Sequence, residues 1–379
     1  MNALIFKILG IVTFVVLGIW YYLQGPDIAV SQQGFQGTGM AVVVDTRDDP
    51  AAAVANRIPD PLPPADAEGA RSATVAYENV QVLRNLNEAE FTRMMAAVTA
   101  WVAPQQGCNY CHVPGNLASD DIYTKVVSRR MFQMTQYINA NWTSHVQQTG
   151  VTCYTCHRGQ PVPQNIWFEE PLNAYSDRLV GNPGGQNRAA PSVGLASLPS
   201  DPFSPYLASS ANIRIQSLEP LPTDNGASIK RTEWTYGLMM HMSTSLGVNC
   251  TYCHNSRSWG SWEQSPPARA VAYYGIRLVR DVNQNYLVPL QDEYPPHRLG
   301  PLGDAPKANC ATCHQGVYKP LLGQSMLDDY PVLRAPYVEE QAPDGEGAVP
   351  PEAAPSGMDE IEEEPTLREE PADDDGQPT

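Results

Sequence analysis

The sequence predicts a mainly α-helical protein with much irregular loop, in which two pseudo-symmetric halves follow a single N-terminal transmembrane helix. Three observations support this fold class. A Cys-x-x-Cys-His motif occurs four times, in two pairs, which indicates an internal duplication. Methionine-bearing stretches with helical periodicity precede the motifs. The 379 residues are 42% apolar but include 35 prolines and 28 glycines, so a sizeable core must be surrounded by long loops.

Residues 1–24 are predicted to form the membrane anchor. No charged residue interrupts Ile8 to Leu23, and with the preceding apolar residues the segment provides about 20 residues, enough to cross a bilayer of about 30 Å as a helix. A cleaved signal peptide is the alternative. The length, the aromatic cluster at Trp20, Tyr21 and Tyr22 and the lack of a small-x-small cleavage site favour a retained anchor.

Composition divides the rest of the chain. Residues 25–76 are rich in Gly, Pro, Ala and Asp without sustained periodicity, which predicts an extended, irregular arm. Ten prolines between Pro161 and Thr223 leave no room for a long helix. This connecting segment, 161–223, separates an N-terminal half, 77–160, from a C-terminal half, 224–335, each holding two motifs.

The C-terminal tail, 336–379, carries most of the net charge of −17. From Glu339 onward it holds fifteen acidic residues and one basic residue, Arg368, with few large apolar side chains. Such a segment repels itself and has little to bury, so we expect it to be disordered and solvated. An electrostatic attraction for a basic partner is the less favoured alternative.

The four motifs account for all eight cysteines. A zinc site would need two cysteine pairs to converge and does not explain a histidine in every copy, and a redox dithiol needs only one motif. Covalent c-type haem explains every position, because two thiols form thioethers and the adjacent imidazole becomes the fifth iron ligand. The sequence therefore predicts four haems on Cys108, Cys111 and His112; Cys153, Cys156 and His157; Cys250, Cys253 and His254; and Cys310, Cys313 and His314.

Methionines on the helices before the first three motifs are candidate sixth ligands. Asn87 and Glu90 form the pattern of a capping box, and Met95 lies on the apolar stripe that follows, while Met94 points about 100° away. A second run, from about Asp120 to Val146, places both Met131 and Met134 on one face.

A third run places Met239 and Met242 on one face, with Gly247 as a C-cap. The fourth motif differs, because no methionine lies between Met242 and Cys310. A histidine is then the expected ligand, and three remain unassigned: His145, His241 and His297.

At these residues the chain resembles the tetrahaem cytochrome subunit of the photosynthetic reaction centre of purple-type bacteria. The resemblance covers nearly everything between the arm and the tail. It rests, in order, on YENVQVLRNLNEAEF, WVAPQQGCNYCH, KVVSRRM, GVTCYTCHRGQ, LMMHMSTSLGVNCTYCH, GIRLVRDVNQNYLVPL and CATCHQGVYKPL. It implies Met95, Met131 and Met239 as sixth ligands of the first three haems and His145 as that of the fourth. Many members carry a lipid on an N-terminal cysteine, and no cysteine is available for one here.

The resemblance implies an electron carrier rather than an enzyme. It would take electrons from a soluble periplasmic donor, a cytochrome c or a high-potential iron-sulfur protein, and re-reduce the bacteriochlorophyll pair held by the reaction-centre core subunits. The haem body would lie in the periplasm, anchored to the cytoplasmic membrane, and no nucleic acid is expected as a partner.

Two other functions fit four motifs. A membrane-anchored multihaem quinol dehydrogenase would also have one helix, but three methionine-bearing helices argue against it. A multihaem reductase would need one iron without a sixth protein ligand, which binding of carbon monoxide would reveal.

Overall fold

The structure is a computed structural model, and it describes residues 2–23, 25, 28–32, 41–47, 49–171, 190–215 and 229–334. The predicted disordered tail, 336–379, lies outside these residues. The predicted connecting segment, 161–223, is described only in part. In its described parts only short 3₁₀ and π turns occur, at Pro191–Val193 and Ser204–Ala208, as its prolines predict.

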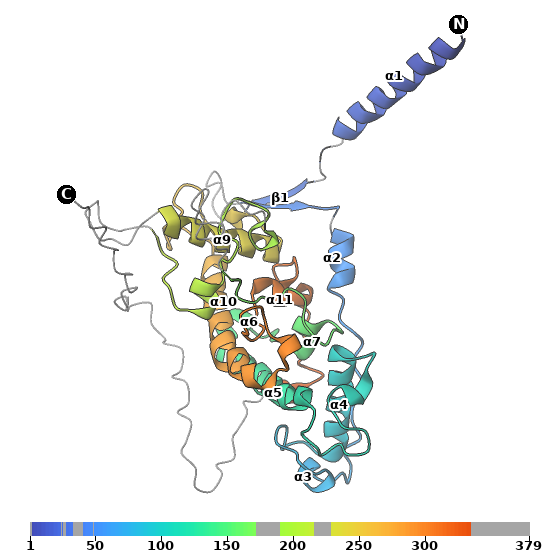
Figure 1. The fold of residues 1–379 in the computed structure, drawn as a ribbon, viewed down its shortest axis with the longest axis vertical. Helices are drawn as coiled ribbons and strands as arrows, with labels where there is room; N and C mark the ends of the chain where they lie inside the picture. Colours follow the sequence, from blue (N-terminus) through green and yellow to red (C-terminus); the bar gives the residue numbers. More distant parts are fainter. Residues whose placement is uncertain are drawn as a thin grey trace, which may run out of the picture. The chain divides into compact units, whose positions relative to one another are not determined.

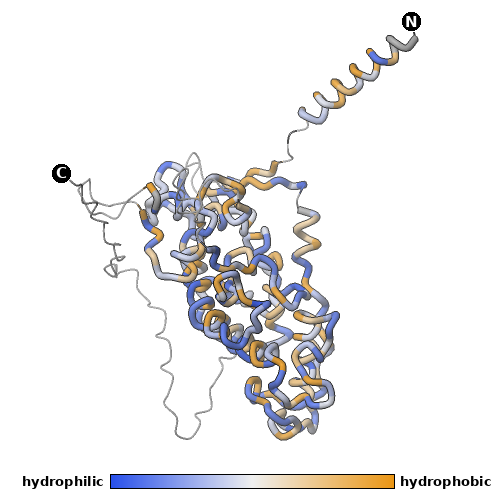
Figure 2. The backbone as a smooth tube through the Cα atoms, in the orientation of Figure 1, coloured by the Kyte–Doolittle hydropathy of each residue, from blue (hydrophilic) through white to orange (hydrophobic). Residues whose placement is uncertain are grey.

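The N-terminal segment forms one helix, α1 (Asn2–Leu23). Its stretch Phe6–Leu23 is long and apolar enough to cross a membrane, and none of it is buried inside the protein. Figure 2 shows apolar residues along its length. An exposed helix of this composition in water would leave a large apolar surface uncovered, which fits the predicted membrane anchor.

The arm contains more regular structure than its composition suggests. Strands β1 (Ile28–Gln32) and β2 (Ala41–Asp45) pair antiparallel, and helix α2 (Asp49–Ala55) follows (Figure 1). The β-branched residues of these strands favour extended backbone. The hairpin is held to the rest of the protein, since the Ala41 carbonyl accepts a hydrogen bond of 2.6 Å from Oγ1 of Thr251, inside the third motif.

The body is built from helices that alternate with the motifs (Figure 1). The longer ones are α4 (Glu88–Val102), α5 (Tyr123–Asn141), α9 (Ile229–Leu246) and α10 (Ala268–Val282). The short ones are α3 (Ala73–Ala76), α6 (Thr143–Val146), α7 (Cys153–His157) and α11 (Cys310–His314). Short 3₁₀ and π turns, at Gly107–Tyr110, Cys250–Tyr252, Asn283–Leu287, Val288–Glu293, Pro296–Arg298, Pro320–Gly323 and Pro331–Leu333, complete the body.

Helix α4 begins and ends where the sequence predicts. The Asn87 side chain accepts from the Glu90 amide at 2.9 Å, and the Glu90 carboxylate accepts from the Asn87 amide at 3.1 Å. This reciprocal pair is the predicted capping box. The helix stops at Val102, two residues before Pro104, which cannot continue it.

The second predicted helix is divided in two. The expected run from Asp120 to Val146 forms α5 and α6, and Trp142 between them leaves the helical region, at φ −111° and ψ 32°. Trp142 is buried and its indole N–H donates to Asp281 of α10 at 2.8 Å. This tertiary contact holds the break, which turns α6 and its His145 toward α10.

Three hydrophobic clusters join segments that are far apart in the sequence. One combines Met94 and Trp101 of α4 with the late segment from Leu321 to Leu333. Another packs Ile138 and Trp142 against Leu278 and Val282 of α10. The third gathers Trp167, Phe203, Leu238 and Ile276. The first two clusters therefore connect residues assigned to different predicted halves.

Gly247 ends α9 with φ +64°, as expected for a C-cap glycine. A Cβ added there would lie 2.1 Å from the Gly316 carbonyl oxygen, immediately after α11. A left-handed backbone costs an L-residue about 1–2 kcal/mol. We expect Gly247→Ala to lower the free energy of unfolding by more than this, because the new Cβ also clashes with Gly316. Gly303→Ala is the matched control, because Gly303 also has positive φ but no atom within 4 Å. Equal losses in denaturant unfolding of both variants would contradict a close contact between the two turns.

Candidate haem-binding site

The four motifs adopt two local structures that alternate along the chain. The first and third form 3₁₀ turns, at Gly107–Tyr110 and Cys250–Tyr252. The second and fourth form the short helices α7 and α11, each with a capping box, from Thr152 to Thr155 and from Asn309 to Thr312. Their first cysteines, Cys153 and Cys310, are buried. Burial raises the pKa of both thiols to about 12, so both are protonated at neutral pH.

All four motif histidines are oriented by one kind of contact. In each, Nδ1 donates to a backbone carbonyl at 2.9 to 3.1 Å, so that Nε2 is left for a metal ion. The acceptor lies five residues ahead in the first and third motifs and three ahead in the second and fourth. The pairs are His112 with Leu117, His254 with Trp259, His157 with Gln160, and His314 with Val317.

The structure brings His145 of α6 opposite His314 of α11. Their ring centroids are 6.0 Å apart, and Nδ1 of His145 donates to the Val271 carbonyl at 2.8 Å. Burial lowers the pKa of both imidazoles, that of His314 to about 4, so both are neutral at pH 7. Two imidazoles that bind one metal ion from opposite sides, with metal–nitrogen bonds of about 2 Å, have ring centres about 6 Å apart. The pair therefore fits a bis-histidine iron site.

The other two unassigned histidines are placed differently. His241 is buried against Phe203, and its Nε2 lies 3.2 Å from Oγ of Ser245. His297 is exposed in a 3₁₀ turn. Neither faces a motif histidine among the ring contacts of the described residues, whereas His145 does.

Gly275 of α10 gives His145 its space. A Cβ at Gly275 would lie 2.5 Å from Cε1 and 2.9 Å from Nδ1 of His145. The imidazole thus lies directly on the backbone of α10, where the Val271 carbonyl accepts its Nδ1 proton and Gly275, one turn later, leaves space for the ring.

The candidate methionines differ in what they contact. Met94 is only 2% exposed within the first cluster, and Met95 is partly buried at its edge. Met134 packs into the cluster around Trp142, while Met131 is partly buried and belongs to none of the three clusters. Met239 and Met242 both pack against the cluster around Leu238, so their packing does not separate them.

Two motif cysteines differ from the expectation of eight thioethers. Cys156 and Cys313, the second cysteines of the second and fourth motifs, form a disulfide, with Cα atoms 4.5 Å apart. Helices α7 and α11 lie together here, and Arg158 donates to the Cys313 carbonyl at 3.3 Å. A sulfur in a disulfide cannot also carry a thioether. The other six cysteines are free.

The donor set fits covalent haem better than a bare metal ion. Within the described residues, no group of three or more His, Cys, Asp or Glu side chains could hold a metal ion. Cys-x-x-Cys pairs that each precede a histidine with Nδ1 on a backbone carbonyl, on a mainly helical body, are the pattern of a c-type cytochrome.

Comparison with known proteins gives the particular family. The sequence profile of the photosynthetic reaction centre cytochrome C subunit matches residues 24–334. The chain is 53% identical over 313 residues to the photosynthetic reaction center cytochrome c subunit of Rubrivivax gelatinosus, covering 82% of this chain and 85% of that protein. Its counterpart in Thermochromatium tepidum is 50% identical over 333 residues, covering 88% and 81%. That of Roseobacter denitrificans is 43% identical over 351 residues, covering 87% and 92%.

The chain therefore belongs to the family of photosynthetic reaction centre cytochrome c subunits, which transfer electrons to the reaction centre. The predicted resemblance is confirmed, and none of these three relatives is named as a quinol dehydrogenase. Membership implies covalent c-type haem and association with the reaction centre core and its membrane.

Sequence reasoning missed residues that position the histidines. Gly275 and Val271 lie within an ordinary helical pattern, and only the tertiary contact with α6 reveals their roles.

Proposed function

We propose that the chain binds four c-type haems and passes electrons from a soluble periplasmic carrier to the photo-oxidised bacteriochlorophyll pair. The observation that carries the proposal is the shared orientation of five histidines, each with Nδ1 on a backbone carbonyl, in which His145 faces His314. Haem iron supplies the one-electron Fe(III)/Fe(II) couple. The protein itself makes and breaks no substrate bonds, so it is proposed to be a carrier and not an enzyme.

The proposed ligands follow the motif positions. All eight cysteines form thioethers, and the motif histidines are the fifth ligands. Met95, Met131, Met239 and His145 are the sixth ligands of the first to fourth haems. Met131 lies outside the three hydrophobic clusters whereas Met134 packs against one, which supports Met131. Met95 packs against the first cluster, as the buried Met94 does, so its assignment rests on the family resemblance. Choosing Met239 over Met242 rests on the family resemblance alone.

The proposal requires Cys156 and Cys313 to be reduced when haem is attached. Their contact follows from the packing of α7 on α11, so the second and fourth motifs are proposed to hold neighbouring haems. The other six cysteines are free thiols, as thioether formation requires.

The alternation of motif structures supports the proposed duplication. Two 3₁₀ motifs and two helical motifs occur in the order expected if one pair had been copied. We therefore propose two pseudo-symmetric halves, each with a helix before each motif, in the domain order predicted from the sequence.

Location and partners follow from the anchor and the family. Covalent haem attachment takes place outside the cytoplasmic membrane, so the haem body is proposed to be periplasmic, with α1 in the membrane and its N-terminus in the cytoplasm. The donor is proposed to be a soluble cytochrome c or a high-potential iron-sulfur protein. The acceptor is the bacteriochlorophyll of the core subunits.

The test is to count and titrate the haems of the purified complex. We expect an intact mass that includes four haems, which stay attached after acid-acetone washing, and four midpoint potentials, three higher and one lower. Methionine ligation raises the potential, and the bis-histidine site lacks it. Fewer haems would contradict the thioethers at Cys156 and Cys313. Four equal potentials would contradict the ligands, and rapid carbon monoxide binding by the reduced protein would favour a reductase.

A further inference from the structure

Lys125, near the start of α5, places its ammonium group inside the loop that follows the first motif. It is only 7% exposed, and Nζ donates at 2.8 Å to each of the carbonyls of Leu117, Ala118 and Ser119. These three bonds use every proton of the ammonium group. A charge this deeply buried is costly unless it is fully bonded, so its position is set by these contacts.

One of these carbonyls also orients the first axial histidine. The Leu117 oxygen accepts from Nδ1 of His112 at 2.9 Å and from Nζ of Lys125 at 2.8 Å. The lysine and the imidazole therefore share one acceptor. Among the described residues, the carbonyls that orient the other three motif histidines, those of Gln160, Trp259 and Val317, receive no lysine or arginine donor.

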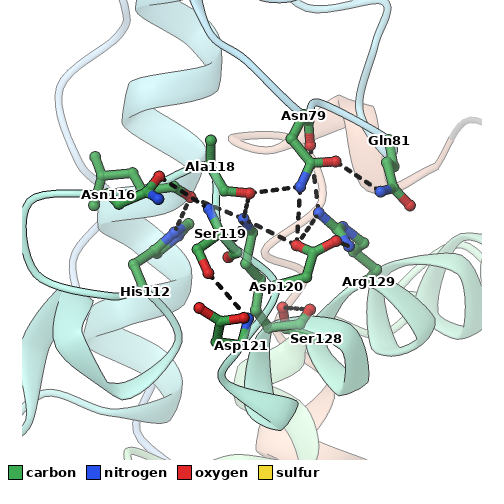
Figure 3. Close-up of polar contacts among 12 residues, drawn as sticks. Asn79, Gln81, His112, Asn116, Ala118, Ser119, Asp120, Asp121, Ser128 and Arg129 are labelled. Carbon is green, nitrogen blue, oxygen red and sulfur yellow. Dashed lines mark hydrogen bonds and ion pairs between the residues drawn. The ribbon is translucent and has the colours of Figure 1, made fainter.

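A second set of contacts fixes the loop and brings Asp120 close to both Lys125 and Arg129. Asp120 accepts two bonds from Arg129, at 2.8 and 2.9 Å, and lies 3.1 Å from Nζ of Lys125. These hydrogen bonds, with that of Arg129 first, hold the pKa of Asp120 well below its usual range, so it is ionised at pH 7. Asn79 donates to the Ala118 carbonyl and to Asp120 (Figure 3). One carboxylate thus pairs with both cations.

We infer that Lys125 is a positioning residue that raises the midpoint potential of the first haem through the Leu117 carbonyl and His112. This rests on the proposed ligation of haem by His112. A cation on the carbonyl weakens it as an acceptor, so the imidazole keeps its Nδ1 proton more tightly and donates less electron density to iron. A nearby positive charge also disfavours Fe(III). Both effects favour the reduced haem.

The test is the redox titration of Lys125→Met in the purified complex, with the first transition identified as the one that shifts in Met95→Leu. We expect the ratio of oxidised to reduced first haem at a fixed potential to rise about tenfold, a fall of about 59 mV for one electron. The other three transitions should stay in place. If Lys125→Met does not assemble, Lys125→Gln carries the same test, because it keeps an amide donor and removes the charge.

Two control variants separate this role from loop stability and from general charge. Asn79→Ala removes contacts to Ala118 and Asp120 but leaves Lys125 on Leu117. Arg129→Met removes the positive charge that is paired with Asp120 and leaves the hydrogen bonds to the Leu117 carbonyl in place. Both should shift the first haem less than Lys125→Met does. An unchanged first potential in Lys125→Met, equal shifts of all four haems, or equal shifts in the controls would overturn the inference. Failure of the wild-type protein to show four haems would instead overturn the proposed function.

Discussion

Replacing Gly275 by alanine is expected to displace His145, the proposed sixth ligand of the fourth haem. The new Cβ would lie 2.5 Å from Cε1 of the imidazole, far inside van der Waals contact, so the ring must leave its position and its bond to Val271. The fourth haem should become five-coordinate and high-spin, bind carbon monoxide when reduced, and rise in potential by on the order of 100 mV. Optical and EPR spectra of the purified complex measure each of these.

Two comparisons show whether the effect passes through His145. Ala270→Val enlarges an exposed residue of the same helix and should leave the fourth haem low-spin. In a His145→Ala background, Gly275→Ala should add no further shift, because the group that it displaces is already gone. A low-spin spectrum in Gly275→Ala, or full additivity of the two substitutions, would contradict the assignment of His145.

Replacing Met131 by leucine is expected to remove the proposed sixth ligand of the second haem. Leucine is close to methionine in volume but has no sulfur, so folding should change little while the haem loses its thioether. Because that thioether raises the potential, the second transition should fall by on the order of 100 mV and the haem should bind carbon monoxide.

Met134→Leu is the matched control on the same helix. Met134 packs against the cluster around Trp142, so its substitution should affect stability slightly and leave all four potentials unchanged. Redox titration of both variants decides the assignment. A shift in Met134→Leu with none in Met131→Leu would reverse the two roles.

The parts predicted from sequence are those fixed by local chemistry. The capping box of α4, the C-cap at Gly247 and the four motifs depend on residues a few positions apart, and the structure places the capping box and the C-cap as expected. The hairpin of β1 and β2 was not predicted, because each strand has only five residues and shows too little alternation of apolar and polar residues within a glycine-rich segment. The break at Trp142 depends on Asp281, which lies 139 residues away.

The candidate site also depends on contacts between residues far apart in the sequence, which spacing alone does not predict. Sequence spacing left three histidines open for the fourth haem, since none lies on a helix directly before its motif. The choice of His145 needs the turn at Trp142, the carbonyl of Val271 and the bare backbone at Gly275 together. Met131 and Met134 share one predicted helix face. They differ only in the structure, where Met134 packs against a cluster that includes residues of α10 and Met131 does not.

Because His145 faces His314 of the fourth motif, the two proposed halves would not be independent modules. Under the proposed ligation, the N-terminal half would supply an imidazole to the fourth haem of the C-terminal half. In the structure, residues from Leu321 to Leu333 also share a hydrophobic cluster with Trp101. A gene fragment that encodes either repeat alone would leave an iron or a core incomplete. The two proposed halves are therefore expected to fold and bind haem only as one chain.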